Sequence, residues 1–227
     1  MVKTILIVLY CKVILVQFQS GVEKNALSLN PEKTKVISLS RERDVFFYRY
    51  VLEGNVIYRV SLVRDLGVYN DSPLSFTVHV SKIVGSAIRK LGMIACLSGS
   101  FTSPLSVVRL FCSLVRSGLE FGSISWNSLS LTQVEIIERV QKKFMRIIYD
   151  RYIGRKLFFS YDLLLPLFNL ERLSTRRAVR DIHFLHKVVH GTVNTENLLM
   201  NIDFHVPFRS SRHFLTFYPT KICESSP

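Results

Sequence analysis

The spacing of the apolar residues changes near residue 76, and this change most constrains what the chain can fold into. Before it, short β-prone segments alternate with turns: Lys35–Ser40 partly alternates apolar and polar residues, and Val45–Tyr48 and Val56–Val60 flank a turn at Glu53–Asn55. After it, apolar residues recur every three or four positions, as on one face of a helix. The sequence therefore predicts an α+β fold, in which a small β-rich N-terminal part precedes a mainly helical region.

Several amphipathic helices are expected in the second part. The first begins near residue 76, and Ser103 with Pro104 marks the N-cap and first residue of the next. A third helix is predicted over 133–149, where Thr132 and Glu135 form a capping box, and a basic helix over 171–190. The predicted apolar face of the first helix is Val80, Ile83, Val84, Ala87, Ile88, Leu91 and Ile94, and that of the second is Leu105, Val108, Phe111, Leu114 and Val115.

These patterns divide the chain into three predicted parts. Residues 1–75 form the β-rich part with an apolar N-terminal stretch, 76–195 the helical region, and 196–227 an irregular tail. The 227 residues are enough for one large domain or two small ones.

The chain is basic and apolar at once. Lys+Arg is 30 against Asp+Glu 17, which gives a formal net charge of +13, while 48% of residues are hydrophobic. This apolar content argues against intrinsic disorder. The positive charge favours a polyanionic partner, either nucleic acid or an anionic membrane, although a basic surface kept for solubility has the same composition.

One helix concentrates this charge. On the helix predicted over 133–149, four cations lie within about 100° of one another, opposite the apolar face, and no carboxylate lies within the stripe. Cations one turn apart on a rigid helix can follow a row of phosphates, whereas an ordinary solvated helix face has the same pattern. We define these residues as the basic stripe: Arg139, Lys142, Lys143 and Arg146.

Residues 4–16, TILIVLYCKVILV, are almost entirely apolar. A membrane span needs about 20 such residues, and Lys12 interrupts the run. A signal peptide has a more basic start and a clearer cleavage site. We expect a buried strand here, and a secretory signal or an anchor remains as the alternative.

No metal, cofactor or catalytic site is predicted. The four cysteines are scattered, without zinc-ligand spacing, which fits a reducing compartment and an intracellular location. His183, His186 and His190 share a helix face, but the first and last are about 10 Å apart along the axis, too far for one metal ion. The aspartates are dispersed, so the clustered carboxylates of a two-metal phosphoryl-transfer site are missing.

Several blocks of the sequence together resemble the reverse transcriptases of non-LTR retrotransposons, the LINE-like and jockey-like elements. The blocks are KNALSLNPEKTKVI at residues 24–37, DLGV at 65–68 followed by LSF at 74–76 and His79, CSLVRSGLEFGSISW at 112–126, and ERVQKKF at 138–144. In that family they belong to the end of the polymerase palm and to the thumb. Their order covers roughly residues 22–190.

The resemblance implies roles for particular residues. Lys33 and Lys35 match a basic turn near the phosphates of the incoming nucleotide, and Leu66 and Gly67 match the primer-grip hairpin. The helices from about residue 78 match the region that holds the template–primer duplex. The basic stripe would then contact the backbone of RNA or of an RNA–DNA duplex.

The departure from the family concerns its catalytic Mg²⁺ ligands. An aromatic-Ala-Asp-Asp box should precede the Lys-Thr turn, yet no aspartate precedes Asp44. We therefore expect a truncated fragment without polymerase activity of its own, at most a sequence-independent binder of nucleic acid in the nucleus or cytoplasm. Two alternatives stay open: a helical protein-interaction module, secreted or tethered through residues 4–16, and a chain with no selected function.

Overall fold

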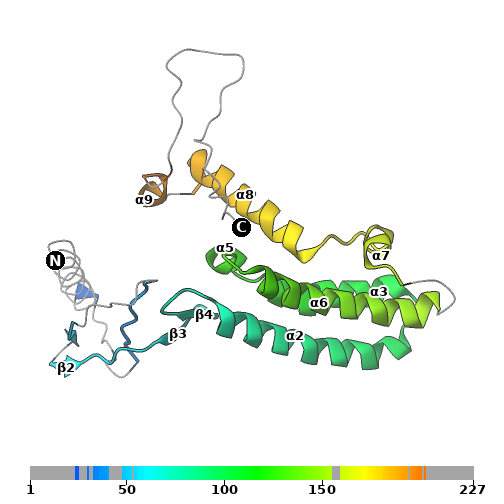
Figure 1. Cartoon of the computed structure of the whole chain (residues 1–227), viewed down its shortest axis with the longest axis horizontal. Helices are drawn as coiled ribbons and strands as arrows, with labels where there is room; N and C mark the ends of the chain where they lie inside the picture. Colours follow the sequence, from blue (N-terminus) through cyan, green and yellow to red (C-terminus); the bar gives the residue numbers. More distant parts are fainter. Residues whose placement is uncertain are drawn as a thin grey trace, which may run out of the picture. The chain divides into compact units, whose positions relative to one another are not determined.

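The computed structural model describes residues 24–25, 30, 33–40, 48–52, 54–154, 159–193, 195–200 and 202. It confirms the α+β class, with two small antiparallel hairpins followed by helices (Figure 1). The chain divides into two compact units, Met1–Ser174 and Thr175–Pro227. The apolar stretch at residues 4–16 and most of the predicted tail lie outside the described residues.

Two short hairpins make up the described β structure. Strand β1 (Val51–Leu52) pairs with β2 (Asn55–Val56) around the predicted turn, and β3 (Leu62–Asp65) pairs with β4 (Val68–Asp71). The second hairpin closes through two residues at positive φ, Leu66 at 45° and Gly67 at 91°. Positive φ at both turn positions matches the twist of the flanking strands, so this pair sets the register of the hairpin.

The predicted strand over Lys35–Ser40 is wrong. In this segment only Val36 makes a bridge, in parallel to Arg59, and the predicted strand at Val56–Val60 shortens to β2 and that bridge. The segment Lys35–Ser40 thus forms one isolated bridge and no strand. The first three residues of Val45–Tyr48 lie outside the described part of the chain.

Helices form the rest of the first unit. The predicted long helix is α2 (Thr77–Leu97), and the predicted basic-striped helix is α6 (Leu131–Ile148), which packs along α2 (Figure 1). Between them the chain forms short segments, and after α6 it continues through η3 (Tyr149–Ile153) and α7 (Tyr161–Leu167). The short segments are η1 (Ser98–Ser100), α3 (Pro104–Leu110), η2 (Phe111–Arg116), α4 (Ser117–Glu120) and α5 (Ser123–Trp126).

Helix α8 (Leu173–Val189) confirms the predicted basic helix over 171–190. One further turn of helix, α9 (Glu196–Leu199), lies where an irregular tail was predicted.

The predicted capping box of α6 is wrong by two residues. Ser130 is the N-cap, and its hydroxyl accepts a hydrogen bond from the Gln133 backbone N–H, while the Gln133 side chain accepts from the Ser130 N–H at 2.9 Å. The buried Gln133 amide also donates to the Ser75 carbonyl at 2.8 Å and to Thr77 Oγ1 at 3.2 Å. These long-range bonds tie the start of α6 to the start of α2 and explain why this cap is used.

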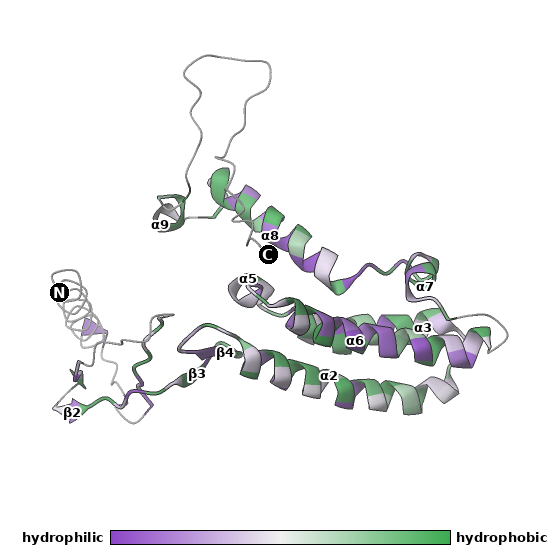
Figure 2. Ribbon diagram, viewed as in Figure 1, coloured by the Kyte–Doolittle hydropathy of each residue, from purple (hydrophilic) through white to green (hydrophobic). Residues whose placement is uncertain are grey.

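The core lies between α2, α6 and the short segments. Phe111 and Phe144 stack with their ring centroids 4.0 Å apart, and Trp126 is fully buried. Most of the predicted α2 face is buried, but Ile88 is 43% exposed. In Figure 2, hydrophobic and hydrophilic colouring alternate along α6, and its buried residues include Ile137, Phe144 and Ile148.

The helix after Pro104 departs from the α-helical period. Ser103 is the N-cap and Pro104 the first residue, as predicted, but η2 is a π-helical turn. A π-turn takes more residues per turn and so rotates the following side chains relative to an α-helix. Leu114, within this turn, was predicted to be buried and is therefore exposed; Leu105, which precedes the turn and was also predicted to be buried, is exposed as well.

His79 fastens the second hairpin to the helices. Its ring is buried on α2, and Nδ1 accepts a hydrogen bond from the Tyr69 backbone N–H of β4 at 3.3 Å. The ring also packs edge-on against Trp126 at 4.9 Å. Burial lowers the pKa of His79 because the interior disfavours a charged imidazolium.

Candidate nucleic-acid interface

The residues that were predicted to contact nucleic acid lie on three separate elements. Lys33 and Lys35 are exposed on a turn that Asn30 closes, since Lys33 N–H donates to the Asn30 carbonyl and to its Oδ1, both at 3.2 Å. The Thr34 hydroxyl donates to the same carbonyl at 2.9 Å. This arrangement confirms a turn at Asn30, with both ammonium groups free to reach a phosphate.

Leu66 and Gly67 form the tip of the β3–β4 hairpin. Leu66 is 87% exposed, so an apolar side chain stands in solvent at the end of a rigid turn. Gly67 lies close to Phe121, because a Cβ at this position would come 3.4 Å from Phe121 Cε1. The tip thus presents Leu66 and Phe121 outward, two apolar groups against which a base or a sugar ring can pack.

The basic stripe of Arg139, Lys142, Lys143 and Arg146 lies on α6 along the outer side of the helix, and we call it the α6 stripe. Arg139 and Lys142 have side-chain exposures of 70% and 39%. The prediction that no carboxylate lies in the stripe is wrong, because Glu135 reaches both: its Oε1 lies 3.1 Å from Lys142 Nζ and 3.9 Å from Arg139 Nε. Glu135 is one turn before Arg139, so the stripe begins with an anion that offsets part of its positive potential.

Aromatic rings engage two cations of the stripe. Arg146 lies over the Phe159 ring at 4.9 Å, and Lys142 lies over the Tyr161 ring at 5.7 Å. Such contacts hold each cation near the protein surface and stabilise it by about 0.5–1 kcal/mol at exposed sites. Within the described residues, Lys143 is the member of the stripe with neither an ion pair nor a ring contact.

Sequence reasoning overlooked a second group of cations. The chain has no Asp or Glu between Asp71 and Glu120, and this segment forms α2, η1, α3 and η2. The sequence marks this segment by its lack of acidic residues, and a search for clusters of basic residues does not detect such a stretch. The segment carries five cations, all exposed or half-buried: Lys82, Arg89, Lys90, Arg109 and Arg116.

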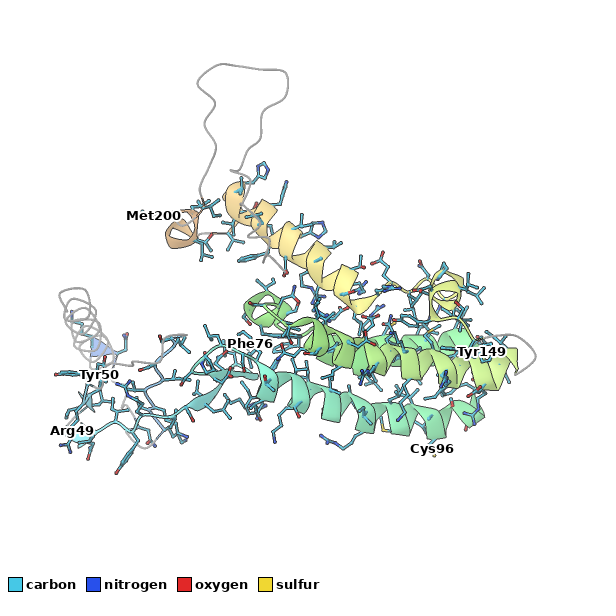
Figure 3. The ribbon with its side chains drawn as sticks, in the orientation of Figure 1. Arg49, Tyr50, Phe76, Cys96, Tyr149 and Met200 are labelled. Carbon is cyan, nitrogen blue, oxygen red and sulfur yellow. The ribbon has the colours of Figure 1, made fainter. Side chains whose placement is uncertain are left out.

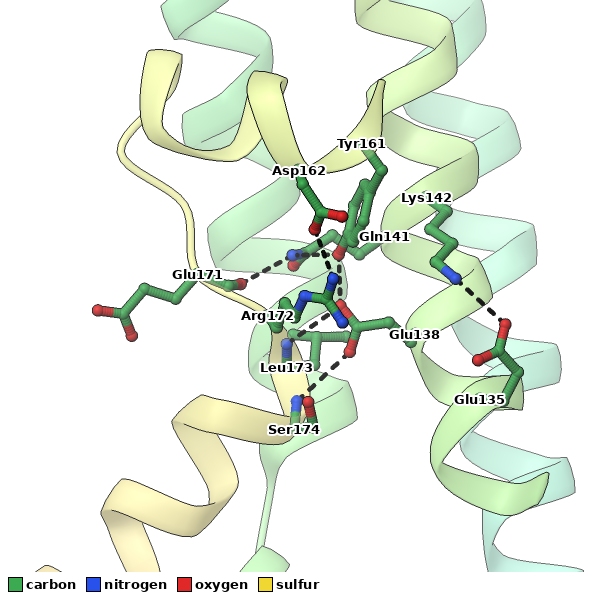
Figure 4. Close-up of polar contacts among 10 residues, drawn as sticks. All are labelled: Glu135, Glu138, Gln141, Lys142, Tyr161, Asp162, Glu171, Arg172, Leu173 and Ser174. Carbon is green, nitrogen blue, oxygen red and sulfur yellow. Dashed lines mark hydrogen bonds and ion pairs between the residues drawn. The ribbon is translucent and has the colours of Figure 1, made fainter. Parts of the chain in front are cut away.

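A buried polar cluster joins α6, α7 and the start of α8 (Figure 4). The Glu138 carboxylate accepts hydrogen bonds from the Tyr161 hydroxyl and from the backbone N–H groups of Leu173 and Ser174, both at 3.3 Å. Gln141 donates to the Tyr161 hydroxyl at 2.9 Å and to the Glu171 carbonyl at 2.8 Å.

This cluster is structural in character. Glu138 occupies the N-terminal end of α8, where the helix dipole and the unpaired N–H groups favour an anion. Burial, and then the hydrogen bond to Glu138, raises the pKa of Tyr161 well above its usual range, so the phenol keeps its proton and acts as a donor. A carboxylate with these neighbours is fully occupied and holds the helices together.

The structure offers no evidence for a metal site in the part of the chain that it describes. No three His, Cys, Asp or Glu side chains gather there as they would around a metal ion. His186 and His190 are adjacent, with ring centroids 4.1 Å apart. Among the described helices, none combines the length and apolar character that a membrane crossing requires.

Comparisons of this chain with protein-family models, with curated proteins and with solved structures find no match.

Proposed function

We propose that this chain binds the sugar–phosphate backbone of RNA or of an RNA–DNA duplex without reading sequence. One observation carries the proposal: the charges exposed on the helices from Thr77 to Gly154 are nearly all positive. The carboxylates of this range are Glu120 and Glu138, which are buried, and Glu135 and Asp150, which are exposed. Against them stand Lys82, Arg89, Lys90, Arg109, Arg116, Arg139, Lys142, Lys143, Arg146 and Arg151.

Backbone binding suits this distribution. Nucleic acid carries a dense row of phosphates with condensed counterions, and each cation that neutralises a phosphate releases counterions. The cations here lie along helices. Contacts of this kind position a duplex and carry little sequence information.

We further propose that the chain derives from the palm end and thumb of a non-LTR reverse transcriptase. The order of its motifs supports this origin, and two of them occupy suitable elements. The Lys33–Lys35 motif lies on a turn, and Leu66–Gly67 on a hairpin tip. In this proposal the chain has no templated polymerase activity alone, because the family's Asp-Asp box has no counterpart in it.

Two experiments test these statements separately. Fluorescence polarisation with a labelled RNA–DNA duplex measures the affinity over a range of salt concentrations, and we expect log affinity to fall linearly with log salt, by about 0.9 for each phosphate neutralised. Neutralising Lys143 and Arg146 to Gln should reduce that slope. Primer extension with Mg²⁺ and deoxynucleotides tests the second statement, and any templated incorporation would refute it.

A further inference from the structure

We infer that the outer side of α2, together with η2, is the principal contact surface for the nucleic-acid backbone, and that the α6 stripe contributes less. This inference rests on the proposed function. The cations of this contact surface are Lys82, Arg89 and Lys90 of α2 and Arg116 of η2, and we call the four the α2–η2 face.

The spacing of the residues on α2 sets the direction of this face. Lys82, Arg89 and Cys96 are seven residues apart, so they lie on one side of the helix, with about 10 Å along the axis between successive members. The buried residues of α2, such as Val84 and Leu91, lie on the opposite side. Figure 3 shows Cys96 projecting from α2 on the side away from α6, which is therefore also the side of Lys82 and Arg89.

Contacts with η2 extend this face to a second element. The Lys90 ammonium donates to the Leu114 carbonyl of η2 at 3.0 Å. The same Nζ is 3.5 Å from the position that a Cβ would take on Gly118 of α4, so Lys90 reaches the end of η2 where α4 begins. Arg116 follows Leu114 by two residues. Because α2 and η2 pack together, Arg116 lies on the element next to α2.

No exposed carboxylate of the segment competes for these cations. Asp71, which precedes the segment, accepts hydrogen bonds from the Ser75 hydroxyl and from the Phe76 N–H at 3.0 Å. Glu120, which ends it, is buried. By contrast, Glu135 is exposed and pairs with two cations of the α6 stripe. A phosphate that approaches α6 must compete with a carboxylate already in place, whereas at Lys82 and Arg89 no carboxylate of the segment competes with it.

Nucleic acid suits this face better than an anionic membrane does. A helix that binds a bilayer surface inserts a continuous apolar side into it. The main apolar side of α2 is buried in the core, and the apolar residues that α2 leaves exposed, Val78, Ile88, Met93 and Leu97, are interspersed with its cations. The outer side of α2 presents Arg89, whose planar guanidinium can bind a phosphate through two parallel hydrogen bonds. The two cations spaced along the axis of α2 then follow a duplex backbone.

Two matched variants of the full chain test the inference. The first is Lys82→Gln/Arg89→Gln on α2, and the second is Arg139→Gln/Lys142→Gln on α6, so each removes one lysine and one arginine. We expect the α2 variant to lower the salt slope for a labelled RNA–DNA duplex by about 1.8, and the α6 variant by less than half as much. The α2 variant should keep the wild-type urea midpoint, and the α6 variant should lose no more than about 1–2 kcal/mol with its ion pairs and its ring contact, so both stay folded in the binding assay.

The outcomes separate this inference from the proposed function. If the wild-type chain binds and the α6 variant loses as much slope as the α2 variant, or more, the assignment of the surface is wrong but the function stands. If the wild-type chain fails to bind the duplex, both are wrong. If it binds vesicles of phosphatidylserine and not the duplex, the partner is a membrane and the inference also falls.

Discussion

Replacing Glu138 by alanine tests the polar cluster that joins α6, α7 and α8. The side chain is 5% exposed and accepts from one phenol and two backbone N–H groups. Alanine removes the acceptor and leaves the three donors in the interior, because Tyr161, Leu173 and Ser174 are held by their own elements. The α8 N-terminus would also lose the anion that its dipole favours.

The size of the effect follows from these contacts. A hydrogen bond to a charged group contributes about 1.5–3 kcal/mol net, and the two backbone bonds at 3.3 Å belong at the lower end of that range. Relief of the desolvation of a buried carboxylate offsets part of the loss. We expect Glu138→Ala to lower the free energy of unfolding by about 3–4 kcal/mol, a large part of the 5–15 kcal/mol typical of a domain.

Urea denaturation followed by circular dichroism measures this loss. With a slope of about 2 kcal/mol per molar urea, the midpoint should fall by about 1.5–2 M without a change in slope. Glu135→Ala is the matched control, since Glu135 is an exposed carboxylate one turn earlier on the same helix and its ion pairs should contribute less than about 1 kcal/mol. Equal midpoints for the two variants would refute the structural role of Glu138.

Three further outcomes are expected. Burial holds the pKa of His79 below its ordinary 6.5, so as pH falls the unfolded chain binds a proton before the folded chain does. The free energy of unfolding should therefore fall as pH drops below 6.5 and level off below the folded-state pKa. In urea titrations at several pH values, His79→Phe should abolish this component. Glu135→Gln should raise duplex affinity in fluorescence polarisation by freeing two cations, and unchanged affinity would contradict the inhibitory pairing. Gly67→Ala should lower the free energy of unfolding by about 1–2 kcal/mol, since φ is +91° and Phe121 is 3.4 Å from the new Cβ. Gly92 lies in mid-helix, where a Cβ meets nothing within 4 Å, so Gly92→Ala should raise the free energy of unfolding by about 0.5–1 kcal/mol in the same urea assay.

The helices could be predicted from the sequence where local pattern and tertiary packing agree. The long apolar repeats place α2 and α6 within a few residues. The α6 cap was placed wrongly at Thr132 because the deciding bonds of Gln133 reach Ser75 and Thr77, which are distant in the sequence. Helix α7 went unpredicted: Pro166 within it argues against a helix, and its anchor is the tertiary hydrogen bond of Tyr161.

The candidate interface was predictable only in part. The four cations of the α6 stripe do lie on one exposed face, as the helical period requires. Glu135 projects onto the same face on a helical wheel, about 40° from Arg139, so this carboxylate was visible in the sequence and was overlooked because it precedes the four cations. The α2–η2 face joins residues from two elements whose packing includes a π-turn, so no single helical period could bring them together.

The central claim is that this chain binds a nucleic-acid backbone through its exposed cations. The most direct measurement is the affinity of the full wild-type chain for a labelled RNA–DNA duplex between about 50 and 200 mM salt. We predict binding with a steep negative slope of log affinity against log salt, and the same slope for duplexes of unrelated sequence. No binding at the lowest salt, or an affinity that salt does not change, would contradict the claim.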